Sequence, residues 1–134
     1  IGYDLDRQEF RNYGLDRISN FEITTIKKQS PNINIQEYGK NAFGIETYGE
    51  PTPIVLKFEN SQKEYIKSLP FHTSQTIFDE DETHFKVKVK LHPTYDFIME
   101  ILRFGKWCEV VEPESFRNEV KQVISEMYLK YSKI

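Results

Sequence analysis

The 134-residue chain has one cysteine, Cys108, which excludes an internal disulfide and any zinc site built on several cysteines. No apolar run approaches the roughly 20 residues that a membrane-spanning helix needs, and no secretory leader opens the chain. A basic excess is also missing, because 18 Lys and Arg stand against 21 Asp and Glu, a net charge of −3. This charge balance does not favour nucleic-acid binding by the protein as a whole, because such binding usually requires a basic surface. These absences predict a cytoplasmic globular protein with no membrane partner.

Catalytic motifs are missing as well. The sequence contains no G-x-S-x-G nucleophile, no P-loop and no dinucleotide-binding fingerprint. His72, His84 and His92 have no partner four residues away and no carboxylate at metal-ligand spacing. Cys108 beside Trp107 indicates a buried, inert thiol. We therefore expect no enzyme, no metal site and no cofactor.

Residues 1–26 have the pattern of short strands. The expected elements are a strand at Ile1–Leu5, a polar turn at Asp6–Glu9, a strand at Phe10–Leu15, and a helical turn or third strand at Asp16–Ile23 that directs Ile18, Phe21 and Ile23 toward a core. Two strands alone are marginal in water. Because Ile1-Gly2-Tyr3 resembles the middle of a strand, we expect this segment to be the final part of a domain.

Residues 27–52 are the least regular stretch and are predicted to be a linker. The segment Lys27–Asn34 is polar and contains a proline, and Ile35–Gly44 has room for a short helix ending at Gly39. Gly49 and the prolines that follow it mark a second connection. The domain boundary is therefore expected in this stretch.

Residues 53–134 predict the order β-α-β-β-α-β followed by one more helix. The expected elements are strands at Ile54–Phe58, Phe71–Phe78, Phe85–Leu91 and Trp107–Val111, a helix after the capping box Ser61-x-x-Glu64, a helix from Pro93 to Gly105, and a final helix after Pro113. This order is that of a ferredoxin-like sandwich with an antiparallel sheet, helices on one face and the other face free. The expected fold class is α+β.

The predicted helices are amphipathic. The apolar positions expected to face the core are Tyr65, Ile66 and Leu69 in the first, Tyr95, Ile98, Met99 and Leu102 in the second, and Phe116, Val120, Val123, Ile124, Met127 and Tyr131 in the third. Between the second and third strands, Asp79–Glu82 reads as a solvated hairpin loop.

Two groups of basic residues are candidates for binding. Lys86, Lys88 and Lys90 alternate on one strand face, with Lys57 on a neighbouring strand; a solvated face is favoured over a phosphate track, because no aromatic side chains are expected there. Near the N-terminus, Arg7, Arg11 and Arg17 carry guanidinium forks that suit phosphate or carboxylate. The alternative is that Arg11–Glu9 and Arg17–Asp16 form surface ion pairs of little energetic value. The residues alone leave both readings open.

Dispersed motifs give the chain a family resemblance. Phe10–Ile18 resembles the R-x-(aromatic)-x-L-D-R-I stretch of WYL domains, although the naming Trp-Tyr-Leu triplet is absent, and Asn41–Ile45 resembles the segment that leads into the C-terminal extension of that family. His72–Gln75 is similar to its H-x-S-Q motif, and Ile101–Pro113 with Phe116-Arg117 is similar to its ILxFGxxVEVLEP and LR motifs. The chain thus resembles the C-terminal part of a WYL-domain transcriptional regulator.

The resemblance implies a fold and a function. WYL domains are Sm-like, SH3-type small barrels behind a helix-turn-helix, and their extension is ferredoxin-like; residues 1–26 would be the end of the barrel and residues 53–134 the extension. The implied ligand positions are Arg11, Arg17, Tyr13, Tyr3 and Arg7, with His72 and Gln75 as secondary candidates. The implied partners are a nucleic acid or nucleotide effector at the WYL part, DNA through a head outside this sequence, and a second copy of the chain.

Three functions compete at this point. The first is an effector-sensing and oligomerisation region of a bacterial transcriptional regulator. The second is a dimerisation module that binds no small ligand. The third, a small enzyme, would require a pocket that joins His72, Gln75 and a perturbed carboxylate.

Overall fold

The computed structural model describes residues 1–133 and shows an α+β protein with two antiparallel sheets. Within these residues there are four α-helices. The contacts divide the chain into two compact units, Ile1–Tyr38 and Gly39–Ile134. Each unit is therefore described by itself.

The first unit is built on a small hairpin. Its elements are β1 (Gly2–Asp4), β2 (Glu9–Arg11), the 3₁₀ helix η1 (Leu15–Arg17) and α1 (Ile35–Gly39). Tyr3 pairs with Phe10 in the antiparallel register, and their rings meet edge to face with centroids 5.1 Å apart. The ring of Tyr38 lies 6.4 Å from that of Phe10 and its hydroxyl donates to the Phe10 carbonyl, so α1 packs on the hairpin.

Two predictions for this unit have opposite outcomes. The short helix ending at Gly39 is confirmed as α1, whose start is capped by the Asn34 side chain. The prediction that Ile18, Phe21 and Ile23 face a core is wrong, because their side chains are exposed. The segment after η1 has no strand to pair with, so its apolar residues find no surface to cover.

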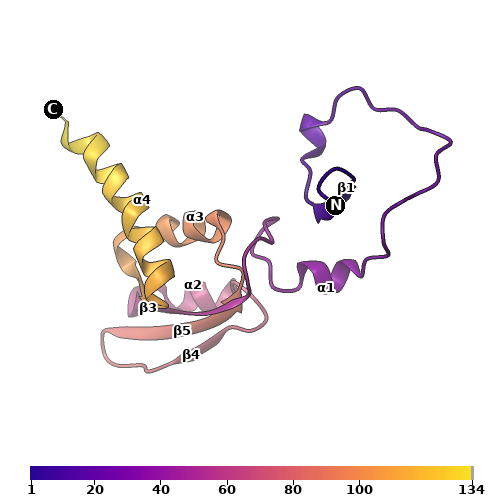
Figure 1. The fold of residues 1–134 in the computed structure, drawn as a ribbon. Coiled ribbons are helices and arrows are strands. Elements are labelled where there is room, and N and C mark those ends of the chain that lie inside the picture. Colours follow the sequence, from indigo (N-terminus) through magenta and orange to yellow (C-terminus); the bar gives the residue numbers. More distant parts are fainter. Residues whose placement is uncertain (134) are drawn as a thin grey trace. The chain divides into compact units, whose positions relative to one another are not determined.

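The second unit contains a four-stranded sheet and three α-helices. Its elements are β3 (Thr52–Glu59), η2 (Asn60–Gln62), α2 (Lys63–Ser68), β4 (Thr76–Phe78), β5 (His84–Leu91), α3 (Tyr95–Arg103), η3 (Gly105–Trp107), β6 (Cys108–Glu112) and α4 (Glu114–Ser132). The strand order is β4-β5-β3-β6 and every neighbouring pair is antiparallel. Figure 1 shows β4, β5 and β3 side by side. The predicted order of strands and helices along residues 53–134 is therefore observed.

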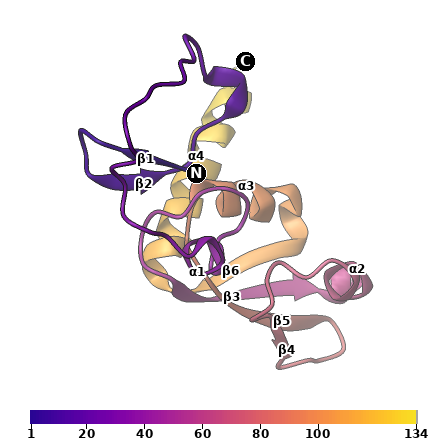
Figure 2. The ribbon, with the colours of Figure 1, turned by 90° about the vertical axis from the view of Figure 1, so that its right-hand side faces the viewer.

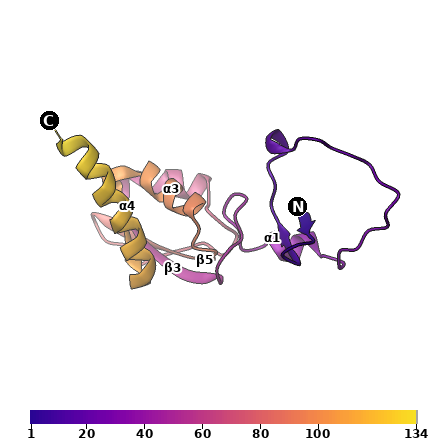
Figure 3. The same ribbon diagram turned by 45° about the horizontal axis from the view of Figure 1, so that its top comes forward.

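The core lies between the sheet and helices that share one side of it (Figures 1 and 3). In β5 burial alternates strictly, with Phe85, Val87, Val89 and Leu91 inside, as the sequence pattern predicts. A network of rings fills the centre: Phe58 stacks on Phe85, and Phe97 of α3 stacks on Phe116 of α4. Ring pairs of this kind add to the stability that their burial provides.

Two local predictions in this unit are wrong because polar side chains bond elsewhere. No side-chain cap forms at the start of α2; the chain enters it through η2, and Asn60 donates its amide to the Asp81 carbonyl instead. The second strand begins at Thr76 rather than Phe71, because the Gln75 side chain bonds across the preceding loop.

The faces of the helices also differ from those expected. Only Ile66 is buried in α2, while Tyr65 and Leu69 are exposed. In α3 the buried residues are Phe97, Ile98 and Ile101. The prediction is confirmed for Ile98 and in part for the half-buried Leu102, and it is wrong for Tyr95 and Met99, which are exposed.

The last strand and the last helix also differ in part from the prediction. Trp107 belongs to η3 and not to β6. Helix α4 follows a cis peptide bond at Pro113 and buries Phe116 and Val120. The remaining predicted core positions of α4 are half-buried or exposed, and Figure 2 shows its C-terminal part extending away from the sheet.

Candidate functional sites

Three of the predicted ligand residues gather around one carboxylate in the first unit. Arg7 Nη1 lies 3.4 Å from Asp4 Oδ2, and Arg11 Nη1 lies 3.9 Å from the same oxygen. The Tyr13 hydroxyl is 3.5 Å from it. This group, Asp4, Arg7, Arg11 and Tyr13, is called the arginine cluster below. Asp4 was not foreseen from the sequence, although an aspartate at a strand end before a turn is a known signal for a side chain that bonds the following backbone.

The hairpin itself builds the arginine cluster. Asp4 accepts hydrogen bonds from the backbone N–H groups of Arg7 and Asp6, which fix the turn. These bonds, that from Arg7 first, together with the positive charge of Arg7, lower the pKa of Asp4 below its ordinary value. Gly2 lets the Tyr13 ring approach, since a Cβ at Gly2 would lie 3.0 Å from Tyr13 Cε2.

The other two predicted residues lie outside the arginine cluster. Tyr3 pairs with Phe10, and alternation places this pair on the hairpin face opposite Asp4 and Arg11. Arg17 lies on η1, where its Nε is 3.9 Å from Asp16 Oδ2 and its side chain is 87% exposed. The structure therefore brings together Arg7, Arg11 and Tyr13 and leaves Arg17 as a separate surface residue.

Both surface ion pairs considered from the sequence are present. Besides the Arg17–Asp16 pair, Arg11 Nε lies 3.8 Å from Glu9 Oε1. The side chains of Arg7 and Arg11 are 62% and 42% exposed, so water screens these contacts. Such long, exposed ion pairs are weak, and an anion with a better geometric fit can replace them at small cost.

The secondary candidates, His72 and Gln75, belong to a loop that their side chains hold in place. The His72 ring bonds the Lys40 carbonyl and the Ser74 hydroxyl, and Ser74 Oγ accepts the Lys90 N–H at 2.9 Å. Gln75 accepts the Phe71 N–H at 3.0 Å and donates to the Ile66 carbonyl. The H-x-S-Q motif thus ties the α2–β4 loop to β5 and to the start of the unit.

The segment before β3 is tied to the N-terminus of α3. Glu46 Oε2 accepts the Asp96 N–H at 2.8 Å, and the Tyr48 hydroxyl accepts the Tyr95 N–H. Asp96 in turn accepts the Ile45 N–H. These side chains supply the cap that Thr94, the residue at the helix boundary, does not provide.

The lysine face of the sheet differs from the expectation in one respect. Lys57 lies on the neighbouring strand, as predicted, and is paired there with Lys86. Phe78 is also paired with Lys86 and is partly exposed, so an aromatic ring shares this face, contrary to the expectation. The Asp79 carboxylate accepts a hydrogen bond from Lys86 Nζ and raises the pKa of that amine. Glu112 adds to this effect. Carboxylates on the face therefore offset part of its positive charge.

Helix α4 exposes an apolar stripe beyond the core. Ile124, Met127, Tyr128 and Tyr131 follow the spacing of one helix face and are between 45% and 84% exposed. The stripe, defined by these four residues, continues the line of the buried Val120. Exposed apolar surface of this kind is typical of interaction sites.

Among residues 1–133 no group of three or more His, Cys, Asp or Glu side chains is arranged to hold a metal ion. None of the helices described is both long and apolar enough to cross a bilayer.

Comparison with protein families identifies the second unit. Residues 50–128 match the model of the WCX domain, which is more than half of the chain. The chain belongs to the WCX domain family. WCX is the C-terminal domain associated with WYL, so the match confirms the resemblance to the C-terminal region of WYL-family regulators. Among curated proteins, none matches the chain.

The WCX match covers the H-x-S-Q loop and the α4 stripe as far as Tyr128, but not Tyr131. It does not cover the arginine cluster, which precedes residue 50. The identification of residues 1–26 as the end of a WYL domain stays a prediction. The assignment of ligand roles to the arginines stays one as well.

Proposed function

We propose that this chain is the regulatory region of a bacterial transcriptional regulator of the WYL family, acting in the cytoplasm. In this proposal the arginine cluster senses an anionic effector, a nucleic acid fragment or nucleotide, and the WCX domain assembles the protein as a homodimer. DNA is bound by a helix-turn-helix head outside this sequence. The chain has no catalytic role.

The arginine cluster is the observation that carries the sensing part of this proposal. Two guanidinium groups and a phenol converge on one carboxylate oxygen, and both guanidinium groups remain accessible to solvent. Arginine recognises phosphate oxygens through paired hydrogen bonds, which are stronger than the long ion pairs present here. An incoming phosphate would take the guanidinium groups from Asp4 and Glu9.

We also propose specific fold types for the two parts. The strand order β4-β5-β3-β6, with β-α-β-β-α-β connectivity, supports a ferredoxin-like sandwich for residues 53–134, extended by α4. The paired β1 and β2 are compatible with the last strands of an Sm-like, SH3-type barrel in residues 1–26, joined by a linker at 27–52.

A titration tests the sensing role. The 134-residue chain is titrated with a fluorescein-labelled single-stranded oligodeoxynucleotide and, separately, with a nucleoside 5′-phosphate. Arg7→Ala with Arg11→Ala is expected to weaken binding by about tenfold or more, since two charge-assisted contacts are lost. Arg17→Ala is expected to have a smaller effect because Arg17 lies outside the arginine cluster.

The matched control removes two positive charges elsewhere, through Lys106→Ala with Lys130→Ala. Equal weakening by the control and by the arginine variant would mean that binding follows net charge alone, and the assigned site would be wrong. Full affinity in Arg7→Ala with Arg11→Ala would also mean that the assigned site is wrong.

The second candidate function is a dimerisation module that binds no effector. The α4 stripe favours it, because four adjacent apolar side chains are left in water. Sedimentation at tens of micromolar protein tests it. Met127→Lys is expected to shift the chain toward monomer, while Asn118→Lys, on the opposite face of α4, should not. A wild-type chain that sediments as a monomer at this concentration would exclude the stripe as a dimer interface.

A further inference from the structure

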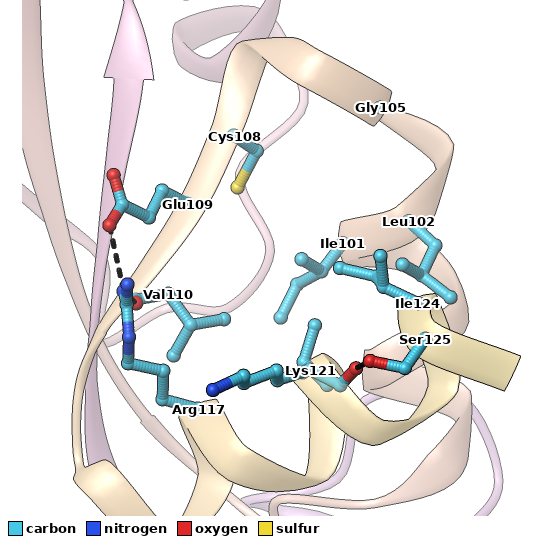
Figure 4. A pocket seen from close by; sticks show the side chains of 11 residues that line it. Ile101, Leu102, Gly105, Cys108, Glu109, Val110, Arg117, Lys121, Ile124 and Ser125 are labelled. Atoms are coloured by element: carbon cyan, nitrogen blue, oxygen red, sulfur yellow. Dashed lines mark hydrogen bonds and ion pairs between the residues drawn. The ribbon is translucent and has the colours of Figure 1, made fainter. Parts of the chain in front are cut away.

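A cavity in the WCX domain lies where α4 leaves the core. It has a volume of about 240 Å³ and lies between α3, β6 and α4 (Figure 4). Its lining residues are Ile101, Leu102, Gly105, Cys108, Glu109, Val110, Arg117, Val120, Lys121, Ile124 and Ser125. Ligand pockets for drug-sized molecules are commonly 300–1,000 Å³, so this space suits a smaller molecule.

The inner wall of the cavity is apolar. Ile101, Val110 and Val120 are buried members of the core, and Leu102 is half-buried. Figure 4 shows Cys108 on the same wall. Burial, with a smaller effect of Glu109, raises the pKa of the Cys108 thiol to about 12, so this group is neutral at physiological pH. The wall therefore favours an uncharged, hydrocarbon part of a ligand.

The rim of the cavity carries positive charge. Arg117 donates to Glu109 Oε1 at 2.8 Å and to the Val110 carbonyl, so its guanidinium fixes α4 to β6 and its charge is matched. Lys121, one turn further along α4, extends along the rim toward Arg117 (Figure 4). Within residues 1–133, no carboxylate forms an ion pair with Lys121 among the contacts of the structure.

We propose that this cavity binds a small amphipathic carboxylic acid, with its hydrocarbon tail against Ile101 and Val110 and its carboxylate at Lys121. Charge complementarity selects this class of ligand. The apolar wall excludes a second charged group, and the one unmatched cation at the rim favours a single negative charge. This site is separate from the arginine cluster, which would take an anion rich in oxygen atoms.

The test uses hexanoate and hexanamide as probes of equal size and different charge. Both are titrated into the 134-residue chain, and amide chemical shifts are followed by ¹H–¹⁵N NMR. Hexanoate is expected to shift the resonances of Cys108, Val110 and Val120 and to bind more tightly than hexanamide. Lys121→Gln is expected to weaken hexanoate by about tenfold and to leave hexanamide unchanged. Lys130→Gln, nine residues further along α4, is the matched control.

A second pair of variants tests the place of binding. Ser125→Trp, at the exposed mouth, is expected to abolish binding of both probes, whereas Ser132→Trp, at the end of the same helix, is not. Circular dichroism checks that both variants fold. Arg7→Ala with Arg11→Ala should leave hexanoate binding unchanged, so failure here is distinguishable from failure of the proposed effector site.

Three results would overturn the proposal. The first is equal affinity for hexanoate and hexanamide. The second is equal loss of hexanoate binding in Lys121→Gln and Lys130→Gln. The third is that resonances lining the cavity respond to protein concentration but not to hexanoate, which would mean that a second copy of the chain covers the cavity.

Discussion

The two units of this chain contrast in how they bury apolar side chains. In Gly39–Ile134, alternating strands and three helices enclose a ring-rich core, and Phe58, Phe85 and Phe97 have no exposed surface. In Ile1–Tyr38, no side chain is buried, although the sequence there contains six isoleucines. Apolar composition alone therefore does not make a core. The sheet and helices must also provide two surfaces that close on each other.

The two units also differ in how exposed their polar contacts are to solvent. In the second unit, the side chains of Gln75 and Glu46 form hydrogen bonds with partly buried backbone groups. In the first unit, the arginine side chains that contact the half-buried Asp4 are themselves exposed to water. Removing a buried partner leaves a polar group unsatisfied, whereas removing an exposed one returns its partner to solvent. Variants in each unit test whether the two units differ in this way.

The largest difference is expected between core and surface phenylalanines. Phe58→Ala should reduce the free energy of unfolding by about 3–5 kcal/mol, because a buried ring that contacts Phe85 and Phe104 is removed. Phe21→Ala should change it by less than about 0.5 kcal/mol, since that side chain is exposed. Urea unfolding followed by circular dichroism measures both. Equal losses would mean that the first unit has a core.

A smaller effect is expected at the α2–β4 loop. Gln75→Ala should cost about 1–3 kcal/mol, because the Phe71 N–H and the Ile66 carbonyl each lose their partner. Gln122→Ala removes only a surface bond to Glu126 and should cost less than about 0.5 kcal/mol. The same unfolding assay applies. A neutral Gln75→Ala would argue against a structural role for the H-x-S-Q motif.

Next in size is the cap of α3. Glu46→Ala should cost about 1 kcal/mol, since the Asp96 N–H at the helix start loses its acceptor and the helix dipole loses a favourable negative charge. Glu50→Ala, a few residues away, serves as the control. Thermal unfolding of the two variants gives the comparison, and equal midpoints would show that the cap contributes nothing.

The smallest effects concern two aspartates, one in each unit. Asp81 accepts the N–H groups of Thr83 and His84, and these bonds lower its pKa to about 2. The pKa of Asp4 is lowered by the hydrogen bonds that it accepts from the backbone N–H groups of Arg7 and Asp6. Because the folded pKa lies below the unfolded value, each carboxylate stabilises the fold above the unfolded pKa.

For Asp81 this stabilisation is expected to fade as the pH falls from about 4 toward about 2. Carboxyl ¹³C shifts measured against pH give both pKa values. In Asp81→Asn the dependence of stability on pH over this range should be weaker than in wild type. A titration of Asp81 near its ordinary value would contradict the turn geometry.

The sequence predicted the second unit well where burial alone decides the structure. Strict alternation in Phe85–Leu91 and the Pro113 stop before α4 were sufficient to predict β5 and the last helix. The predictions were wrong where a polar side chain can form its hydrogen bonds with more than one segment of the chain. Asn60 and Gln75 bond carbonyl and N–H groups of distant segments, which a local pattern cannot reveal. The face of α3 was predicted wrongly at two positions because Tyr95 and Met99 match a helical spacing as well as Phe97 and Ile101 do.

The candidate sites were less predictable than the fold. Arg7, Arg11 and Tyr13 were named in advance, but Asp4, which they surround, was not, since only the closed turn places it there. The cavity beside α4 had no signal in the sequence. Cys108 of β6 and Lys121 of α4 line the same cavity only because α4 packs back against β6.

The length of helix α4 amplifies any small change in its tilt. Its first two turns are held by Phe116, Val120 and the Arg117 contacts with β6, while beyond Val120 every described side chain except the half-buried Val123 is exposed. From Val120 to Ser132 a helix extends about 18 Å, so a tilt of about 10° at its base moves the far end by about 3 Å. Because the cavity lies beside the base of this part of the helix, we expect a ligand that tilts α4 to move Tyr131 further than the residues near Val120.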